Sequence, residues 1–330
     1  PGGTSRGVLR EKETYFLILE KEGKQGIGEC GLFKGLSADD RPDYEAKLQF
    51  VCENIGQGHE WLFKQVYDLP SIQFGLEQAF LSLDSEYPFE LIPSKFTRGT
   101  DAIAINGLIW MGDEPFMKDQ IAEKIEAGFT TVKLKIGAID FDTELGLLKF
   151  IRNEFSEKDI ELRVDANGAF LPTEALEKLN YLSDYHLHSI EQPIKAGQWQ
   201  EMAELCEKTP LPIALDEELI GIFNIPDKEK LIKTILPQYI ILKPSLIGGF
   251  AGSDAWIHLA ESNNIGWWIT SALESNVGLN AIAQYTYSLN VNRPQGLGTG
   301  GLFTNNFDSP LYVIRGKLHY NPKLNWKFNL

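Results

Sequence analysis

From about residue 100 onward, short apolar runs alternate with amphipathic segments. Seven runs have the length and the content of β-branched or aromatic residues that is typical of strands. They are IAINGLI (103–109), TTVKLKI (130–136), IELRVDA (160–166), LHSIEQP (187–193), PIALDEE (212–218), QYIILKPS (238–245) and GWWITSA (266–272). Between them, apolar residues at three- and four-residue intervals predict helices that start near Pro115 and Pro172 and others around Trp199 and Trp256. Strand-then-helix units repeated in this way predict a parallel sheet, most simply a (β/α) barrel.

The first 95 residues have a different pattern. EKETYFLILEKEGKQGIGECGLF (11–33) predicts two strands around a glycine turn, and residues 43–85 are helical in character. Near the end of the chain, SPLYVIRGKLHYNP (309–322) again resembles strands. We therefore expect an α/β protein: a capping domain at 1–95 of α+β type, a modified TIM-type (β/α)7β barrel at 96–303, and a C-terminal segment at 304–330 that returns to the cap.

One polar residue ends each of five consecutive predicted strands. These residues are Lys135, Asp165, Glu191, Asp216 and Lys243, at intervals of 30, 26, 25 and 27 positions. Side chains alternate between the two faces of a strand, so the apolar neighbours of these residues face the helices, while Lys133 and Arg163 share the inner face. Successive strand ends are neighbours at the rim of a barrel, where active sites of this fold lie. The sequence therefore predicts that the five residues meet in one cavity.

The residue types at this rim indicate metal-assisted proton transfer. Asp165, Glu191 and Asp216 offer hard oxygen ligands, which suit Mg²⁺ and allow Mn²⁺. Lys135 and Lys243 come from strands on opposite flanks of that group. Lys133 beside Lys135, both poorly solvated, should lower the pKa of Lys135, which would let it act as a general base.

The composition of the chain indicates which kinds of molecule the protein binds. The chain has 31 Lys and Arg against 46 Asp and Glu, a net charge of −15, which disfavours nucleic acid and anionic membranes as partners. Its three cysteines are widely spaced, which suggests a reducing, cytoplasmic compartment. No apolar run reaches the roughly 20 residues of a membrane span, and no signal peptide is visible. We expect a small carboxylate as substrate. The oligomeric state is open.

Six motifs occur in order along the chain: KLK (133–135), VDANGAF (164–170), EQP (191–193), LDEE (215–218), KPS (243–245) and SALES (271–275). In these motifs the chain resembles the muconate-lactonizing subgroup of the enolase superfamily. The resemblance implies that Asp165, Glu191 and Asp216 bind Mg²⁺. It also implies that Lys135 removes a proton from the carbon next to a carboxylate, that Lys133 tunes Lys135, and that Lys243 faces the substrate from the other side.

The same resemblance implies roles for residues around this centre. Asn167, Glu217 and Arg163 would surround the metal ligands. The substrate would contact the capping loops GTSRG (3–7, with Ser5 and Arg6) and GECGLFKGLS (28–37), together with Gly248, Gly249, Ser271 and Glu274. GTSRG and GLGTGGLFTNN (296–306) favour the dehydratase family of menaquinone biosynthesis, which converts a cyclohexadiene carboxylate to an aromatic acid through an enediolate.

Three other functions fit parts of this pattern. A racemase of N-acylamino acids or an epimerase of dipeptides would use the same two lysines. Dipeptide epimerases of the subgroup carry Asp-x-Asp near the eighth strand, where this chain has GLGTGGLF, so the sequence disfavours them. A Schiff-base aldolase would need one buried lysine and no metal, which leaves the three carboxylates unexplained. A barrel without catalytic activity would not need the five groups at their regular spacing.

Overall fold

The computed structural model describes residues 2–4 and 7–330 and contains a seven-stranded parallel sheet. Its strands are β6 (Gly107–Ile109), β7 (Thr131–Lys135), β8 (Glu161–Asp165), β9 (Ser189–Glu191), β10 (Ile213–Leu215), β11 (Tyr239–Leu242) and β12 (Gly266–Ile269). Each strand pairs with the next one along the chain, so the sheet curls in one direction. This arrangement confirms the predicted α/β class and the parallel sheet.

A short stretch around Gln295 joins the two edges of this sheet. Gln295 N donates to Ala104 O at 2.9 Å, and Asn106 N donates to Gln295 O at 3.0 Å. On the other side, Gly296 N donates to Ile269 O at 2.8 Å and Ser271 N donates to Gly296 O at 2.9 Å. Residues 295–296 therefore take the place of an eighth strand between β12 and the chain just before β6.

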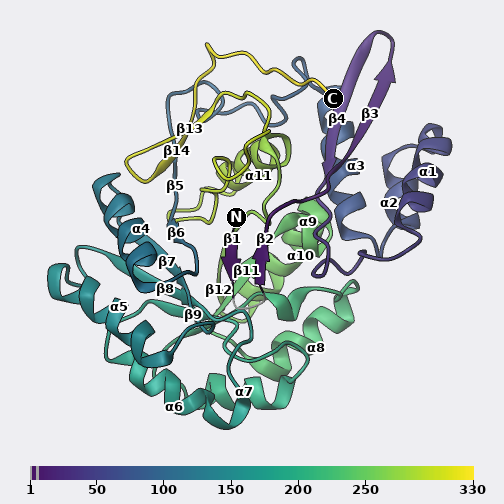
Figure 1. Ribbon diagram of the computed structural model, residues 1–330. Helices are drawn as coiled ribbons and strands as arrows, with labels where there is room; N and C mark the ends of the chain where they lie inside the picture. The colour runs from purple at the N-terminus through teal and green to yellow at the C-terminus, as the bar shows by residue number, and fades with distance from the viewer. Residues whose placement is uncertain (1, 5–6) are drawn as a thin grey trace.

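Helices follow the strands and cover the outer face of the sheet (Figure 1). They are α4 (Glu114–Glu126), α5 (Phe141–Glu154), α6 (Pro172–Ser183), α7 (Trp199–Lys208), α8 (Ile225–Ile235), the short α9 (Pro244–Ile247), α10 (Gly249–Ser262) and α11 (Asn276–Ser288), with a 3₁₀ turn η2 (Glu217–Leu219) after β10. Four of these helices lie where the sequence predicts them: α4, α6, α7 and α10. The other four are not among the predicted helices. One of them is α11, whose residues 277–286 are all buried, and a helix covered on most sides shows no polar stripe.

The N-terminal part of the chain forms its own layer beside the barrel (Figure 1). It contains a hairpin of β3 (Tyr15–Lys21) and β4 (Lys24–Cys30), then α1 (Tyr44–Glu53), η1 (Ile55–Gln57), α2 (His59–Gln65) and α3 (Pro70–Asp84). Before it, β1 (Gly2–Thr4) pairs with β2 (Gly7–Leu9). A separate apolar cluster fills the space between β3, β4 and the three helices. Among the residues that the structure describes, no helix is both long and apolar enough to span a membrane.

The C-terminal segment contacts both other parts. Strands β13 (Leu311–Ile314) and β14 (Lys317–Tyr320) form a hairpin, and β14 pairs with β5 (Ile103–Ala104). The predicted strand 103–109 is thus split, since β5 belongs to this sheet and β6 to the barrel. Further on, the rings of Phe307 and Phe328 pack edge-on against Phe16 of β3.

The hairpin packs on α3 through glycine. A Cβ atom on Gly28 of β4 would lie 1.9 Å from the carbonyl oxygen of Gly75 on α3, and one on Gly26 would lie 2.2 Å from the carbonyl oxygen of Ala79. These backbones approach so closely that no side chain fits between them. The sequence QGIGEC therefore specifies this strand–helix contact as much as the apolar residues around it do.

Two buried glutamates of the N-terminal part hold barrel helices at their first turns. Glu29 of β4 accepts hydrogen bonds from Ser275 N (2.9 Å), Ser275 Oγ (2.5 Å) and Gly278 N (2.8 Å) at the start of α11. Glu77 of α3 accepts from Phe250 N (2.5 Å) and Ala251 N (2.9 Å) at the start of α10. Helix N-termini favour negative charge and carry unpaired N–H groups, so both contacts fix the position of the cap on the barrel.

Gly28→Ala should destabilise the protein by at least about 2 kcal/mol, because the new methyl group overlaps the backbone of α3. Gly56→Ala is the matched control, since no atom lies within 4 Å of a Cβ placed there, and it should change stability by less than about 0.5 kcal/mol. Chemical denaturation of both variants measures the difference. Equal stability of the two variants would contradict the close contact between β4 and α3.

Glu77→Gln should alter how stability depends on pH. Burial raises the pKa of Glu77 to about 7, although the two N–H groups that donate to Glu77 act to lower it. Between pH of about 4.5 and 7 the folded protein keeps a proton on Glu77 that the unfolded chain has released. The contribution of Glu77 to stability therefore falls as the pH rises through this window, by up to about 3 kcal/mol.

The amide that Glu77→Gln introduces does not titrate, so the unfolding free energy of the wild type minus that of the variant should decrease from pH 4.5 to pH 8. Urea denaturation at several pH values gives this difference directly. A difference that stays constant across this range would show that Glu77 does not carry the shift.

Candidate active site

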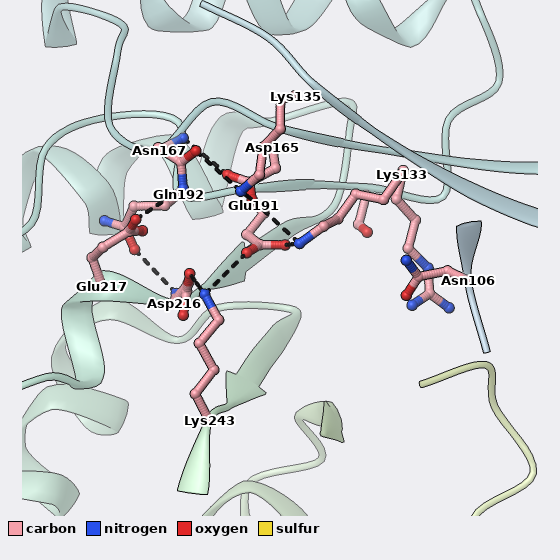
Figure 2. Close-up of polar contacts among 12 residues, drawn as sticks. Asn106, Lys133, Lys135, Asp165, Asn167, Glu191, Gln192, Asp216, Glu217 and Lys243 are labelled. Atoms are coloured by element: carbon pink, nitrogen blue, oxygen red, sulfur yellow. Dashed lines mark hydrogen bonds and ion pairs between the residues drawn. The ribbon is translucent and has the colours of Figure 1, made fainter. Parts of the chain in front are cut away.

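The five predicted strand-end residues meet inside the barrel, together with Lys133 (Figure 2). Lys133 Nζ lies 2.7 Å from Glu191 Oε2 and 3.3 Å from Asp165 Oδ2. Lys135 Nζ donates to Asp165 and, at 3.1 Å, to Asn167 Oδ1. Lys243 Nζ donates to Asp216 and lies 3.9 Å from Glu191 Oε1. Three lysines and three carboxylates thus form one connected group that spans β7 to the end of β11.

All six charged side chains of this group are buried. The most exposed of them is Lys243, at 8 %. Buried charges cost several kcal/mol each unless they are paired, so each ion here depends on partners from a neighbouring strand. Strand register supplies those partners, because Lys135 lies opposite Asp165 and Asp165 lies opposite Glu191.

The pKa values of Lys135 and Lys243 shift in opposite directions. Burial lowers the pKa of Lys135, and Lys133 and Lys243 add to this effect, although Asp165 opposes it. The direction agrees with the sequence-based prediction, but burial rather than Lys133 is the largest cause. Burial also acts on Lys243, yet Asp216 and Glu191 outweigh it and raise the pKa of Lys243. Lys135 is therefore the easier of the two to deprotonate.

The pKa values of Asp165 and Glu191 also shift in opposite directions. Burial acts to raise the pKa of Asp165, but Lys135 and Lys133 hold it well below its usual range. Burial raises the pKa of Glu191 to about 8, and the neighbouring Asp165 adds to that shift. The protein alone thus compensates the negative charge of Glu191 less fully than that of Asp165.

The donor set suits a divalent cation. Three carboxylates are the oxygen ligands that Mg²⁺ prefers, and Glu191 Oε1 is buried with no hydrogen-bond partner. Each of the three carboxylates accepts from a lysine. Within residues 2–4 and 7–330, no three His, Cys, Asp or Glu side chains are grouped closely enough to hold a metal ion. The chemistry of the residues therefore fits Mg²⁺, while their present contacts are with the ammonium groups.

The three predicted surrounding residues lie at this centre in two layers. Asn167 has a left-handed backbone, with φ of 46°, and its Nδ2 donates to Glu217 Oε1 at 3.0 Å. Its backbone N–H donates to Asp165 Oδ1 at 3.0 Å. Arg163 lies one layer deeper, paired with Glu161 at 2.7 Å and stacked on Trp268 with 4.5 Å between the guanidinium carbon and the ring centre. Arg163 and Trp268 thus fill the barrel interior below the charged group.

A cavity of about 300 Å³ opens above Lys133, Lys135 and Lys243. Its wall combines the N-terminal part, including Leu9, Phe33, Lys34 and Leu36, with barrel residues that include Asn106, Leu108, Trp110, Thr270, Ser271, Leu273, Gly298 and Thr299. The hairpin of β1 and β2 and the loop after β4 therefore reach the carboxyl ends of the strands. Both predicted capping loops reach the cavity. In GTSRG it is Gly7 that lines the cavity, and Ser5 and Arg6 lie outside the described residues.

The predicted substrate-binding residues of the later strands lie in different places. Ser271 lines the cavity. Glu274 is fully buried beside it and accepts from Ser271 Oγ and Ser245 Oγ at 2.5 Å, so it holds Ser271 in place. Gly248 and Gly249 lie against Gln73 and Glu77 of α3, at the contact between cap and barrel and away from the residues that line the cavity.

Sequence reasoning missed several residues of the cavity wall. Asn106 and Trp110 flank β6, and the backbone of Trp110 is held at both polar atoms by Gln120 of α4, at 2.9 and 3.0 Å. Asn106 interrupts an otherwise apolar predicted strand, which is the signal that could have identified it. Lys34 lies in the predicted capping loop 28–37 but is not singled out there, since a lysine in a glycine-containing loop is common on protein surfaces.

Known proteins resemble this chain in sequence and in fold. Residues 117–320 match the family described as "Enolase C-terminal domain-like". The chain is 47 % identical to an o-succinylbenzoate synthase of Desulfotalea psychrophila, over 96 % of this chain and 95 % of that one. The crystal structure of MenC from that organism superimposes with a TM-score of 0.86 at 43 % identity, and the match covers 97 % of both chains.

A more distant solved structure shares the fold. It is the dipeptide epimerase of Enterococcus faecalis in complex with Mg and the dipeptide L-Leu-L-Tyr, with a TM-score of 0.77, 20 % identity, and coverage of 97 % of this chain and 92 % of that one. At this identity the likeness shows the architecture alone. Sequence and fold together show that this chain belongs to the enolase superfamily and, within it, to the family of o-succinylbenzoate synthases, which are lyases.

Proposed function

We propose that this protein catalyses the Mg²⁺-dependent syn-dehydration of 2-succinyl-6-hydroxy-2,4-cyclohexadiene-1-carboxylate to o-succinylbenzoate. The observation that carries the proposal is the placement of Lys135 and Lys243, which bind different carboxylates, Asp165 and Asp216, at the base of one cavity. A substrate carboxylate placed between them would have a base on one side and a cation on the other. The 47 % identity to an o-succinylbenzoate synthase supports the choice of substrate.

Lys135 and Lys243 have different roles in the proposed reaction. Lys135, whose pKa is lowered, accepts the proton from the ring carbon next to the carboxylate. The C–O bond to the neighbouring hydroxyl then breaks, Lys135 returns the proton to the departing hydroxide as water, and the ring becomes aromatic. Lys243, whose pKa is raised, stays charged and stabilises the enediolate formed in between.

Asp165, Glu191 and Asp216 would hold Mg²⁺, with Mn²⁺ as a substitute. When bound, the ion supplies positive charge beside the substrate carboxylate, which makes the adjacent C–H group more acidic. Asn167 and Glu217 would keep the Asp165 side of this group in place through their hydrogen bond.

The cavity wall suits an anionic substrate with an apolar body. Its charged residues are Lys34, Lys133, Lys135 and Lys243, and no Asp or Glu is among the described residues that line it. Leu9, Phe33, Leu108, Trp110 and Leu273 supply apolar surface for the ring and the succinyl chain. A substrate amine would find no carboxylate on this wall, which favours the dehydration over the epimerisation of dipeptides.

We also propose a place in menaquinone biosynthesis and in the cytoplasm. The family to which the chain belongs makes o-succinylbenzoate, and the three cysteines are all unpaired thiols, two of them buried. Free, widely separated thiols are usual for proteins of a reducing compartment.

Turnover should require both the metal and Lys135. Loss of the cyclohexadiene, followed by its ultraviolet absorbance, should be rapid with Mg²⁺ and stop with EDTA. Lys135→Ala should lower kcat by about 10²- to 10⁴-fold, because it removes the general base, while Lys24→Ala on the β3–β4 turn serves as the control and should leave kcat unchanged. Turnover that persists in EDTA or in Lys135→Ala would contradict the proposal.

A second candidate is racemisation of N-acylamino acids, which the two flanking lysines favour. If Lys135 and Lys243 both exchange protons, incubation in D₂O should place deuterium at the α-carbon of both enantiomers, as mass spectrometry can detect. Because Lys243 has a raised pKa, we expect exchange with an N-acylamino acid to be at least about 10-fold slower than dehydration. Exchange at equal or greater rate would make racemisation the main activity.

A further inference from the structure

Gln192 follows directly after Glu191, is fully buried, and lies at one side of the charged group, between Asn167 and Glu217 (Figure 2). Its backbone lies in the left-handed region, with φ of 38°. Such a conformation is unusual for a residue other than glycine and costs about 1 kcal/mol or more, so surrounding contacts must enforce it. The residue belongs to the EQP motif, yet its side chain is not part of the cavity wall.

Every polar atom of the Gln192 side chain is used. Oε1 accepts from Asp216 N at 3.1 Å and from Glu218 N at 3.3 Å. Nε2 donates to Ile194 O and to Glu218 Oε2, both at 3.0 Å. An amide side chain has two acceptor positions and two donor hydrogens, so these four bonds satisfy it completely.

The backbone of Gln192 extends the connection to the neighbouring strand ends. Its N–H donates to Ala214 O at 2.9 Å, and its carbonyl accepts from Gly168 N at 2.7 Å. Glu218 in turn accepts from Gly197 N at 2.7 Å. One residue thus links the segments after β8, β9 and β10, which carry Asp165, Glu191 and Asp216.

The contact with Asp216 N has a direct consequence for Asp216. The peptide that precedes its Cα is held by Gln192, so the direction in which the Asp216 carboxylate leaves the strand end depends on this hydrogen bond. We propose that Gln192 is a positioning residue that sets Asp216 relative to Glu191 and thereby determines the affinity of the site for a divalent cation. This inference rests on the proposed function for the presence of the cation, but it does not depend on the identity of the substrate.

The pairing also explains why an amide is needed. Gln192→Glu keeps the size of the side chain but replaces the nitrogen that donates to Glu218 Oε2 and to Ile194 O with a second carboxylate oxygen. The two acids would repel each other in a buried setting, and the bond to Asp216 N would no longer be held by a fixed side chain. Combining Gln192→Glu with Glu218→Gln restores a donor–acceptor pair between the two positions with the roles exchanged.

The test is a calorimetric titration of the full chain with Mn²⁺, alongside thermal unfolding of the metal-free protein. Gln192→Glu should weaken Mn²⁺ binding by about 10- to 100-fold, and the double variant should recover to within about 3-fold of the wild type. Gln198→Ala is the control, since the Gln198 side chain lies in the same loop and donates to Lys195 O, and it should bind Mn²⁺ as the wild type does. In turnover assays, Gln192→Glu should need more Mg²⁺ for half-maximal rate while its kcat at saturating Mg²⁺ stays within about 3-fold of the wild-type value.

Two results would overturn the positioning role while leaving the proposed function intact. One is Gln192→Glu with a lowered unfolding temperature but unchanged Mn²⁺ affinity, which would make Gln192 purely structural. The other is a double variant that binds Mn²⁺ as weakly as the single variant. A wild-type protein that does not bind Mn²⁺ or Mg²⁺ at all would overturn both this inference and the metal site of the proposed function.

Discussion

The mutual neutralisation of three lysines and three carboxylates inside the barrel is the interaction on which the rest of the site depends. Neither set could be buried alone, because an unpaired ion in this environment would cost several kcal/mol or change its protonation. Parallel register brings Lys135, Asp165 and Glu191 together on β7, β8 and β9, and the contact of Lys243 with Asp216 extends the group to the end of β11. In the proposed function, the same group would provide a base of lowered pKa, a permanently charged lysine and a set of oxygen ligands for the metal. Stability and chemistry would then depend on one arrangement of charges.

The cap completes the site because buried acids hold it on the barrel. Glu29 and Glu77 bind the first turns of α11 and α10, and the chain that follows Glu29 carries Phe33 and Lys34 into the cavity wall. The aromatic contacts of Phe307 and Phe328 with Phe16 attach the C-terminal segment to the same hairpin. In the proposed function, substrate recognition would therefore depend on contacts far from the reacting atoms.

The charged group could be predicted from the sequence because strand geometry is periodic. A two-residue period and a spacing of 25 to 30 residues suffice to place Lys135, Asp165, Glu191, Asp216 and Lys243 at one rim. Family resemblance added Asn167 and Glu217. The predicted division at 1–95, 96–303 and 304–330 stays a prediction, although the separate apolar cluster of the first part is in keeping with it.

The remaining features depend on tertiary contacts that leave no local pattern. The closure at Gln295 involves only two residues, too few for a periodic signal. Gly248 and Gly249 are predicted to contact the substrate, and in the structure both lie against α3 and neither is among the described residues that line the cavity. Gln192 and Glu274 are polar residues whose roles depend on partners 24 to 29 positions away, which hydrophobic periodicity cannot reveal.

A crystal structure of the protein with Mg²⁺ and o-succinylbenzoate tests the central claim most directly. The account predicts one ion in contact with Asp165, Glu191 and Asp216, and the aromatic ring of the product between the ammonium groups of Lys135 and Lys243. An ion bound elsewhere, or a product that leaves both lysines on the same side of its ring, would contradict it.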